Sequence, residues 1–263
     1  MIGRLLAAGA LLAAAGSASA GFNPGMNDVG SYTVNRLDGS IRPNSPFIDR
    51  ATANAYADWA TPGTGVINGL LTTGLNRLDG DRVNIVPNGL NLLSSMGYSF
   101  ANTNPTGSTA RVTGVSSTVS FFDGVTLAGI GSFTTTSNLS TLVGGGLAAQ
   151  ASIRLTFAAN SLEAFNIFLT PSTIVTITTT AVTFNAGTGT DPALNGQQIR
   201  NPVSIGSSAD ELILNGNIVA DPFGAAPAPD GNVSLLLITN DIPTPSTLAL
   251  LGLGGLIAGR RRR

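Results

Sequence analysis

The stretch that decides the fold class is Arg111-Val-Thr-Gly-Val-Ser-Ser-Thr-Val-Ser-Phe-Phe122, followed by Asp123-Gly124 and by Val125-Thr-Leu-Ala-Gly-Ile-Gly-Ser-Phe-Thr-Thr135. An Asp-Gly pair between two alternating runs is typical of a two-residue hairpin turn. Apolar residues of one parity predict a face toward a core: Val125, Leu127 and Phe133. The other parity is expected in water: Thr126, Ser132 and Thr134. We therefore expect two antiparallel strands here.

Further short strands are expected along the chain, separated by turns rich in Gly, Asn, Asp and Pro. They cover residues 82–86, 95–101, 152–158, 163–170, 174–184, 211–214, 217–220 and 232–239. Many short strands with such turns are typical of all-β domains. We expect a mainly β fold and, within that class, an antiparallel β-sandwich, with a jelly-roll-like or barrel variant left open.

One short helix is expected before most of these strands. Ser45 can cap its start and Pro46 suits its first position. Apolar side chains then recur on one helical face: Ile48, Ala51, Ala55 and Trp59. We expect this face to pack on the sheet; the alternative is that Tyr56 and Trp59 stack on a sugar.

A pentapeptide, Asn-Arg-Leu-Asp-Gly, occurs at residues 35–39 and again at residues 76–80. Because Asp-Gly favours tight turns, we expect two similar hairpin tips. A weaker alternative is a Ca²⁺ site with oxygen ligands from Asp79, Asp81 and Asn84. That ligand set is small and lacks the EF-hand spacing, so no metal site is the favoured prediction.

The composition argues against common kinds of active site. The chain has no Lys, His or Cys, which excludes a Ser-His-Asp triad, a thiol nucleophile and the usual zinc sites. Carboxylates remain, but nothing in the spacing of Asp and Glu residues, Glu163 and Glu211 among them, marks a catalytic pair. We expect no enzyme activity and no cofactor.

The charge of the body argues against nucleic acid as a partner. Leaving out Arg4 and the arginines at 260–263, 8 of the 13 basic residues remain against 14 acidic ones, a net charge of about −6. Such a body has little to neutralise phosphates with. Because only 10% of the residues are charged, strand edges are weakly protected against pairing, which makes self-association an expected property.

The first twenty residues have the pattern of a secretory signal peptide. Arg4 provides the positive start and residues 5–15 form an apolar region too short to span a membrane. Ala18-Ser-Ala20 is a small-residue cleavage site. The mature chain is therefore expected to begin at Gly21.

The last 22 residues form a three-part tail. Pro243 and Pro245 hold the chain extended, and residues 246–259 then carry no charge. As a helix this segment would span roughly 21 Å, short of the roughly 30 Å hydrocarbon core. The chain ends in four positive charges that the positive-inside rule keeps in the cytoplasm: Arg260, Arg261, Arg262 and Arg263.

This tail resembles the PEP-CTERM sorting signal of Gram-negative bacteria. The matching features are Pro243, Pro245, the apolar run 248–258 and the terminal arginines; Thr244 stands where the motif usually has Glu. The resemblance implies export, transient retention in the inner membrane through residues 246–259, and processing by an exosortase, a membrane cysteine transpeptidase. It covers the tail alone and implies nothing about what the body binds.

Together these features predict three parts: a signal peptide at 1–20, an extracytoplasmic β body at 21–241 and a sorting segment at 242–263. The expected function is that of a non-enzymatic cell-surface or extracellular-matrix protein, with polysaccharide or further copies of itself as partners. A carbohydrate-binding β-sandwich is the alternative, and a secreted carboxylate-dependent hydrolase is a weaker one.

Overall fold

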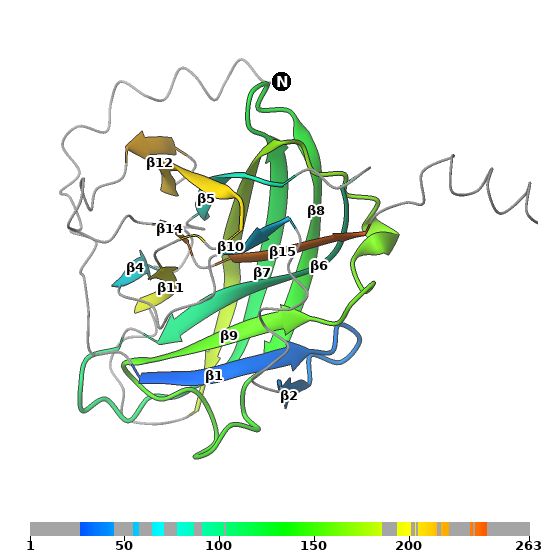
Figure 1. Ribbon diagram of the computed structural model, residues 1–263. Helices are drawn as coiled ribbons and strands as arrows, with labels where there is room; N and C mark the ends of the chain where they lie inside the picture. Colours follow the sequence, from blue (N-terminus) through cyan, green and yellow to red (C-terminus); the bar gives the residue numbers. More distant parts are fainter. Residues whose placement is uncertain are drawn as a thin grey trace, which may run out of the picture.

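The computed structural model describes the middle of the chain as a mainly β protein (Figure 1). The described residues are 27–44, 55–57, 65–70, 78–86, 91–102, 104–185, 194–200, 203, 205–214, 217–220, 232–233 and 235–240. The predicted signal peptide, residues 45–54 of the predicted helix, and the tail 242–263 lie outside them. The predicted mainly β class is confirmed.

The strands form two sheets. In the described residues the larger has nine strands: β1 (Asn27–Val34), β2 (Ile41–Pro43), β3 (Tyr56–Ala57), β4 (Gly65–Leu70), β6 (Leu92–Asn102), β9 (Ala151–Phe157), β11 (Leu194–Arg200), β14 (Asn232–Val233) and β15 (Leu235–Asn240). The smaller has six: β5 (Leu78–Asn84), β7 (Val112–Asp123), β8 (Gly129–Asn138), β10 (Ser172–Phe184), β12 (Ser207–Leu214) and β13 (Asn217–Ala220). β1 and β9 pair in parallel; the other pairings between these strands are antiparallel.

The inner faces of the two sheets share one hydrophobic core. Phe133 of β8 meets Phe157 of β9 edge to face, with ring centroids 5.4 Å apart, and so joins the sheets. Phe121 and Tyr98 belong to the same buried cluster. Burial raises the pKa of Tyr98 to about 12, although the hydroxyls of two serines on the six-stranded sheet lower it in part. Two sheets around one core are consistent with the predicted β-sandwich.

The predicted hairpin at residues 111–135 is present, but its turn is longer than expected. β7 and β8 pair with Val119 opposite Phe133. Asp123 is followed by a five-residue loop, in which its Oδ1 accepts the backbone N–H groups of Val125 (3.0 Å) and Thr126 (2.6 Å). Val125 and Leu127 lie in this loop, 82% and 49% exposed, so their predicted core positions are wrong.

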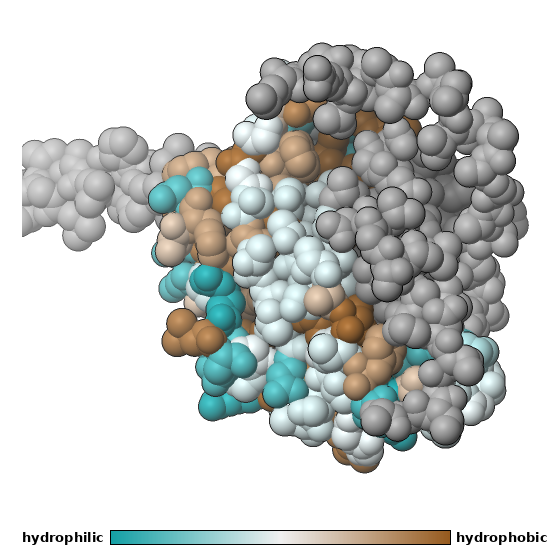
Figure 2. Space-filling model, turned by 180° about the vertical axis from the view of Figure 1, so that it is seen from behind, coloured by the Kyte–Doolittle hydropathy of each residue, from teal (hydrophilic) through white to brown (hydrophobic). Residues whose placement is uncertain are grey.

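The hairpin residues that were expected to face water were predicted correctly. Ser132 and Thr134 are exposed on β8, and Thr126 is exposed in the loop. The hydroxyls of Ser116 and Thr136 lie 3.0 Å apart on this outer face. Figure 2 shows the same side of the molecule, where a broad area of intermediate hydropathy is consistent with these Ser and Thr side chains.

The predicted helix is wrong where it can be checked. Tyr56 and Ala57 form strand β3, which pairs with Leu237 and Leu236 of β15. Tyr56 is fully buried, which excludes it as a sugar-stacking platform; Trp59 lies outside the described residues. Pairing with a distant strand outweighs a local helical pattern because it buries Tyr56 in the shared core.

The predicted strand at 163–170 is also wrong. Residues Glu163–Phe165 form the 3₁₀ turn η2, which ends at Asn166 in a left-handed conformation. The pairing of 211–214 with 217–220 was predicted correctly, as β12 and β13, with Leu214 opposite Asn217.

Candidate functional site

Two adjoining pockets form a groove on the outer face of the nine-stranded sheet, beside β1 and the end of β9. The larger pocket has a volume of about 500 Å³ and the smaller about 390 Å³. Thr33 and Ala158 line both pockets, so the two pockets adjoin each other. We call the pair the β1–β9 groove.

The floor of the groove follows from strand register. Thr33 of β1 lies opposite Thr156 of β9, which pairs on its other side with Gly97 of β6. Gly97 in turn lies opposite Leu236 of β15. Since successive residues point to opposite faces, these four positions share the outer face. Gly97 has no side chain, so it adds none to the row between Thr156 and Leu236.

Asn44 anchors one wall of the groove. Its Nδ2 donates to Ser31 Oγ and to Thr156 Oγ1, both at 2.8 Å, and its Oδ1 accepts the Thr33 hydroxyl. Thr156 Oγ1 donates to the carbonyl of Tyr32 at 3.2 Å. The hydroxyl and amide groups on this side are therefore held in fixed positions by one network.

The opposite wall is a turn held by amides. Asn160 adopts a left-handed φ of 62°, and its backbone N–H donates to Ser94 Oγ at 3.0 Å. Its Oδ1 accepts from Ser94 Oγ (3.0 Å) and from Asn240 Nδ2 (3.1 Å). Asn240 Nδ2 also donates to the carboxylate of Glu163. The larger pocket, at this end of the groove, thus presents neutral amide groups from Asn160 and Asn240.

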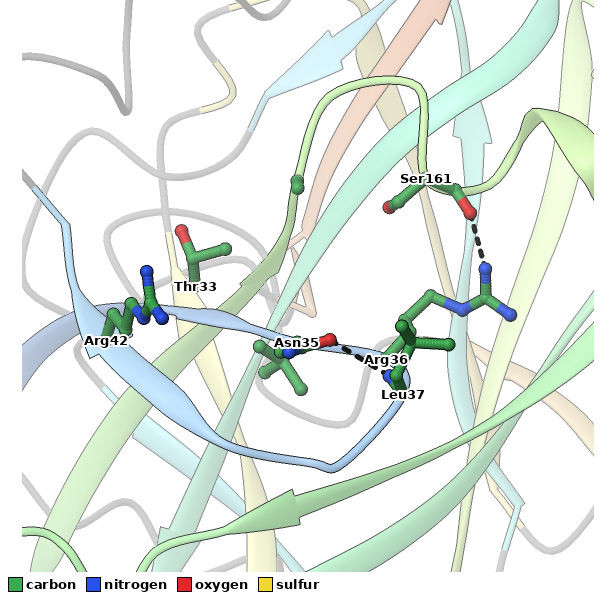
Figure 3. A pocket seen from close by; sticks show the side chains of 8 residues that line it. Thr33, Asn35, Arg36, Leu37, Arg42 and Ser161 are labelled. Carbon is green, nitrogen blue, oxygen red and sulfur yellow. Dashed lines mark hydrogen bonds between the residues drawn. The ribbon is translucent and has the colours of Figure 1, made fainter.

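Two arginines frame the other end of the groove (Figure 3). Arg36 donates to the Ser161 carbonyl at 2.5 Å, and its guanidinium carbon lies 4.4 Å from the centre of the Phe165 ring. These contacts hold Arg36 in place. Arg42 lies on β2 directly opposite Thr33 and is exposed. In Figure 3 the two arginines lie on opposite sides of the pocket.

The nearby acid Asp38 is engaged in the β1–β2 turn. The pKa of Asp38 lies below its usual value of 3.8, chiefly because the Ser40 N–H donates to its carboxylate, with a smaller contribution from the charge of Arg42. Asp38 does not line the groove. Of the described residues that do, none carries a carboxylate, so the arginine end is locally positive in a body that is negative as a whole.

The structure does not assemble the weak Ca²⁺ candidate into one ligand set. Asp81 is fully buried, and its two carboxylate oxygens accept the Ser208 hydroxyl at 2.9 and 3.1 Å. Asn84 is exposed and, three residues further along β5, lies on the opposite face of the strand. The side chain of Asp79 lies outside the described part of the structure. No group of three or more His, Cys, Asp or Glu that could hold a metal occurs in the described part of the chain.

The carboxylates of Glu163 and Glu211 lie in different parts of the fold. Glu163 is in η2, beside the groove, and binds Asn240. Glu211 is in β12 of the six-stranded sheet and pairs with Arg82 at 3.0 Å. Each has its own partner, and the structure does not join them in one site.

The predicted sorting residues lie outside the described residues: Ala18, Ala20, Pro243, Pro245, Arg260, Arg261, Arg262 and Arg263. No helix in the part that the structure describes is both long and apolar enough to cross a membrane. β15 ends at Asn240, which lines the groove, two residues before the predicted tail begins.

Sequence reasoning missed the residues that build the groove, among them Asn44, Asn160, Arg36 and Arg42. Each lies in or beside a turn, where Asn and Arg are ordinary residues. Of these four residues, Arg36 alone belongs to a motif noted in the sequence, the Asn-Arg-Leu-Asp-Gly pentapeptide. Comparisons with protein-family models, with curated proteins and with solved structures find no match for this chain.

Proposed function

We propose that this chain is an exported, non-enzymatic protein of the cell surface or extracellular matrix, sorted through its C-terminal tail. The observation that carries the proposal is the combination of a signal-peptide pattern at residues 1–20 with a proline, apolar and arginine tail at 242–263. The two patterns lie at opposite ends of the chain. Each of them, taken alone, predicts that the body lies on the outer side of the inner membrane.

The finer fold belongs to the same proposal: the body at 21–241 is an antiparallel β-sandwich. Two sheets around a single buried cluster support it. A body without Cys has no disulfides to rely on outside the cell, so the apolar core must supply its stability. That core joins strands from residue 34 to residue 237.

The proposed processing partner is an exosortase, as the tail's resemblance implies. Thr244 in place of Glu is the residue that most directly probes this partnership. Changing Thr244→Glu restores the usual motif without altering the prolines, the apolar run or the arginines, and we expect it to increase the fraction of processed chain.

Mass spectrometry of the mature protein tests the proposal in a bacterium that carries an exosortase. The expected product begins at Gly21 and lacks residues 260–263. Replacing all four terminal arginines by Gln should leave the start at Gly21 unchanged but lower tail processing. A chain that still begins at Met1 and stays in the cytosol would overturn the proposal.

A carbohydrate-binding module is the second candidate function, and the β1–β9 groove favours it. Hydroxyl and amide groups held by hydrogen bonds, next to the apolar side chains of Leu236 and Ile238, suit the polar edges and C–H faces of a sugar ring. A glycan array probed with the full chain tests this candidate, and a loss of signal on changing Asn44→Ala would place the binding in the groove.

A further inference from the structure

We propose that the β1–β9 groove binds an acidic saccharide, with the sugar's carboxylate at the Arg36–Arg42 end and its hydroxyls along the neutral end. The inference deepens the second candidate function, since it names the chemical class of the ligand. It rests on the proposed export only in so far as the protein would meet such a saccharide outside the cell. It starts from the shape: two adjoining pockets of about 390 and 500 Å³ that share Thr33 and Ala158.

The larger pocket is built to hold a polyol rather than an ion. Its polar lining comes from uncharged side chains: Thr33, Asn44, Ser94, Ser95, Thr156, Asn160, Thr239 and Asn240. The Asn44 amide, the Thr156 hydroxyl and the Asn160 amide are fixed by the hydrogen bonds described above, so little side-chain freedom would be lost on binding. Asn44 Nδ2 donates both of its hydrogens within the protein, and Asn160 Oδ1 accepts two bonds there. The remaining capacity is the second lone pair of Asn44 Oδ1 as an acceptor and the Asn160 Nδ2 hydrogens as donors, which matches sugar hydroxyls because these also donate and accept.

The arginine end adds a charge preference. Arg36 uses one N–H for the Ser161 carbonyl, and a guanidinium has five N–H donors in total. Arg42 has no hydrogen-bond partner in the described part of the chain, and it lies opposite Thr33 in the pairing of β1 with β2. A planar guanidinium suits a carboxylate better than it suits a neutral hydroxyl.

The combination distinguishes an acidic saccharide from other anions. An inorganic phosphate, or a lipid phosphate without a polyol headgroup, would use the arginines but not the row of hydroxyls and amides. A neutral sugar makes no use of the charge of the two arginines. No carboxylate residue lines the pocket beside them, although Asp38 interacts with Arg42 from the β1–β2 turn. A ligand that carries both a carboxylate and several hydroxyls uses both ends of the groove.

Titration calorimetry on the full chain, kept in a mild detergent, tests the inference. The probes are a short oligomer of galacturonate and the same oligomer with its carboxylates methyl-esterified, which has nearly the same shape and no charge. We expect the acid to bind at least tenfold more tightly than the ester, because a guanidinium forms a stronger hydrogen bond with a charged carboxylate than with a neutral ester. Raising the salt concentration should narrow this difference.

Variants locate the effect. Arg42→Gln, at an exposed position, should cut the affinity for the acid about tenfold and leave that for the ester unchanged, while Arg42→Lys should retain part of the difference. Arg111→Gln is the matched control, because Arg111 contacts the carbonyls of Val143 and Gly146 away from the groove. Urea unfolding of each variant shows that the fold is kept.

Three results would overturn the inference: equal affinity for acid and ester, no binding of either oligomer, or binding to anionic phosphatidylglycerol vesicles alone. These outcomes are independent of export, because the protein is purified before it meets the probe. A chain found in the cytosol would overturn the proposed location and leave the binding result standing.

Discussion

The tripeptide Leu-Asp-Gly occurs at residues 37–39 and again at residues 78–80, and it forms two different structures. The first copy is the tip of the β1–β2 hairpin, with Gly39 at a φ of +70° and its N–H donating to the Asn35 carbonyl at 2.8 Å. The second copy starts strand β5 and pairs with β10 on one side and β12 on the other. The prediction of two similar hairpin tips is therefore right for the first copy and wrong for the second.

The difference lies in what surrounds each copy. At the first, Asp38 accepts the N–H of Ser40 two residues later, and the Gly39 carbonyl accepts the N–H of Asn138 of β8 at 2.7 Å, without forming a strand ladder there. At the second, Gly80 lies opposite Thr176 on one neighbour and Ile213 on the other. Ladder hydrogen bonds on both sides outweigh the turn preference of Asp-Gly, and the glycine serves close packing instead of a left-handed turn.

The largest expected effect is that of Gly80→Ala. A Cβ at this position would lie 2.1 Å from the Val175 carbonyl oxygen and 2.8 Å from the Thr176 Cα, both backbone atoms of β10. We expect the free energy of unfolding to fall by about 3 kcal/mol, as for severe overpacking. Urea unfolding followed by circular dichroism measures it.

The control for Gly80 is Gly129→Ala, since Gly129 is also in a strand but a Cβ added there would meet no atom within 4 Å beyond its chain neighbours. It should change the free energy of unfolding by less than about 0.5 kcal/mol. If Gly80→Ala proves as mild as Gly129→Ala, β5 does not lie against β10 as described.

Gly39→Ala should have an intermediate effect. Its positive φ costs an L-residue about 1–2 kcal/mol, and a Cβ would lie 2.7 Å from the Thr136 carbonyl oxygen. We expect a loss of about 2 kcal/mol in the same urea experiment. Gly107→Ala separates the two causes, because Gly107 has a φ of +90° but no atom within 4 Å, and should cost only about 1 kcal/mol. Equal losses at both positions would mean that the first copy does not contact β8.

The smallest expected effect is a pH dependence at Asp38. Its folded pKa is lowered, so the ionised carboxylate favours the folded state above the unfolded pKa of 3.8, and this contribution is lost as the pH falls through the folded pKa. Asp38→Asn should unfold slightly more easily than the natural chain at neutral pH, and this difference should shrink as the pH falls below 3.8 and through the folded pKa. Identical urea midpoints at every pH would show that the Ser40 contact does not act on Asp38.

The fold class could be predicted from sequence because buried and partly exposed residues alternate along strands such as β7. Val115, Val119 and Phe121 of β7 are buried, while their neighbours are only partly so. An alternation of this kind can be recognised in the sequence of one strand, without knowing which strands pair with it. The helix could not be rejected in the same way, because what makes Tyr56 and Ala57 a strand is a partner about 180 residues later in the chain.

The groove could not be predicted because its contacts are long-range. Asn44 and Thr156 are 112 residues apart, and Ser94 and Asn160 are 66 apart. Nothing local distinguishes these side chains from other turn and strand residues. The hairpin loop after Asp123 shows the same limit at short range, since the N–H of Gly124 donates to the Ser172 carbonyl at 2.7 Å and so ties the loop to a third strand.

Export of the body is tested most directly by fusing alkaline phosphatase after residue 230 and expressing the fusion in a Gram-negative host. The enzyme is active only after it has crossed the inner membrane. Export through the signal peptide predicts high phosphatase activity, which a fusion lacking residues 1–20 should lose. An inactive, full-length fusion recovered from the cytosol would contradict a surface role for this protein.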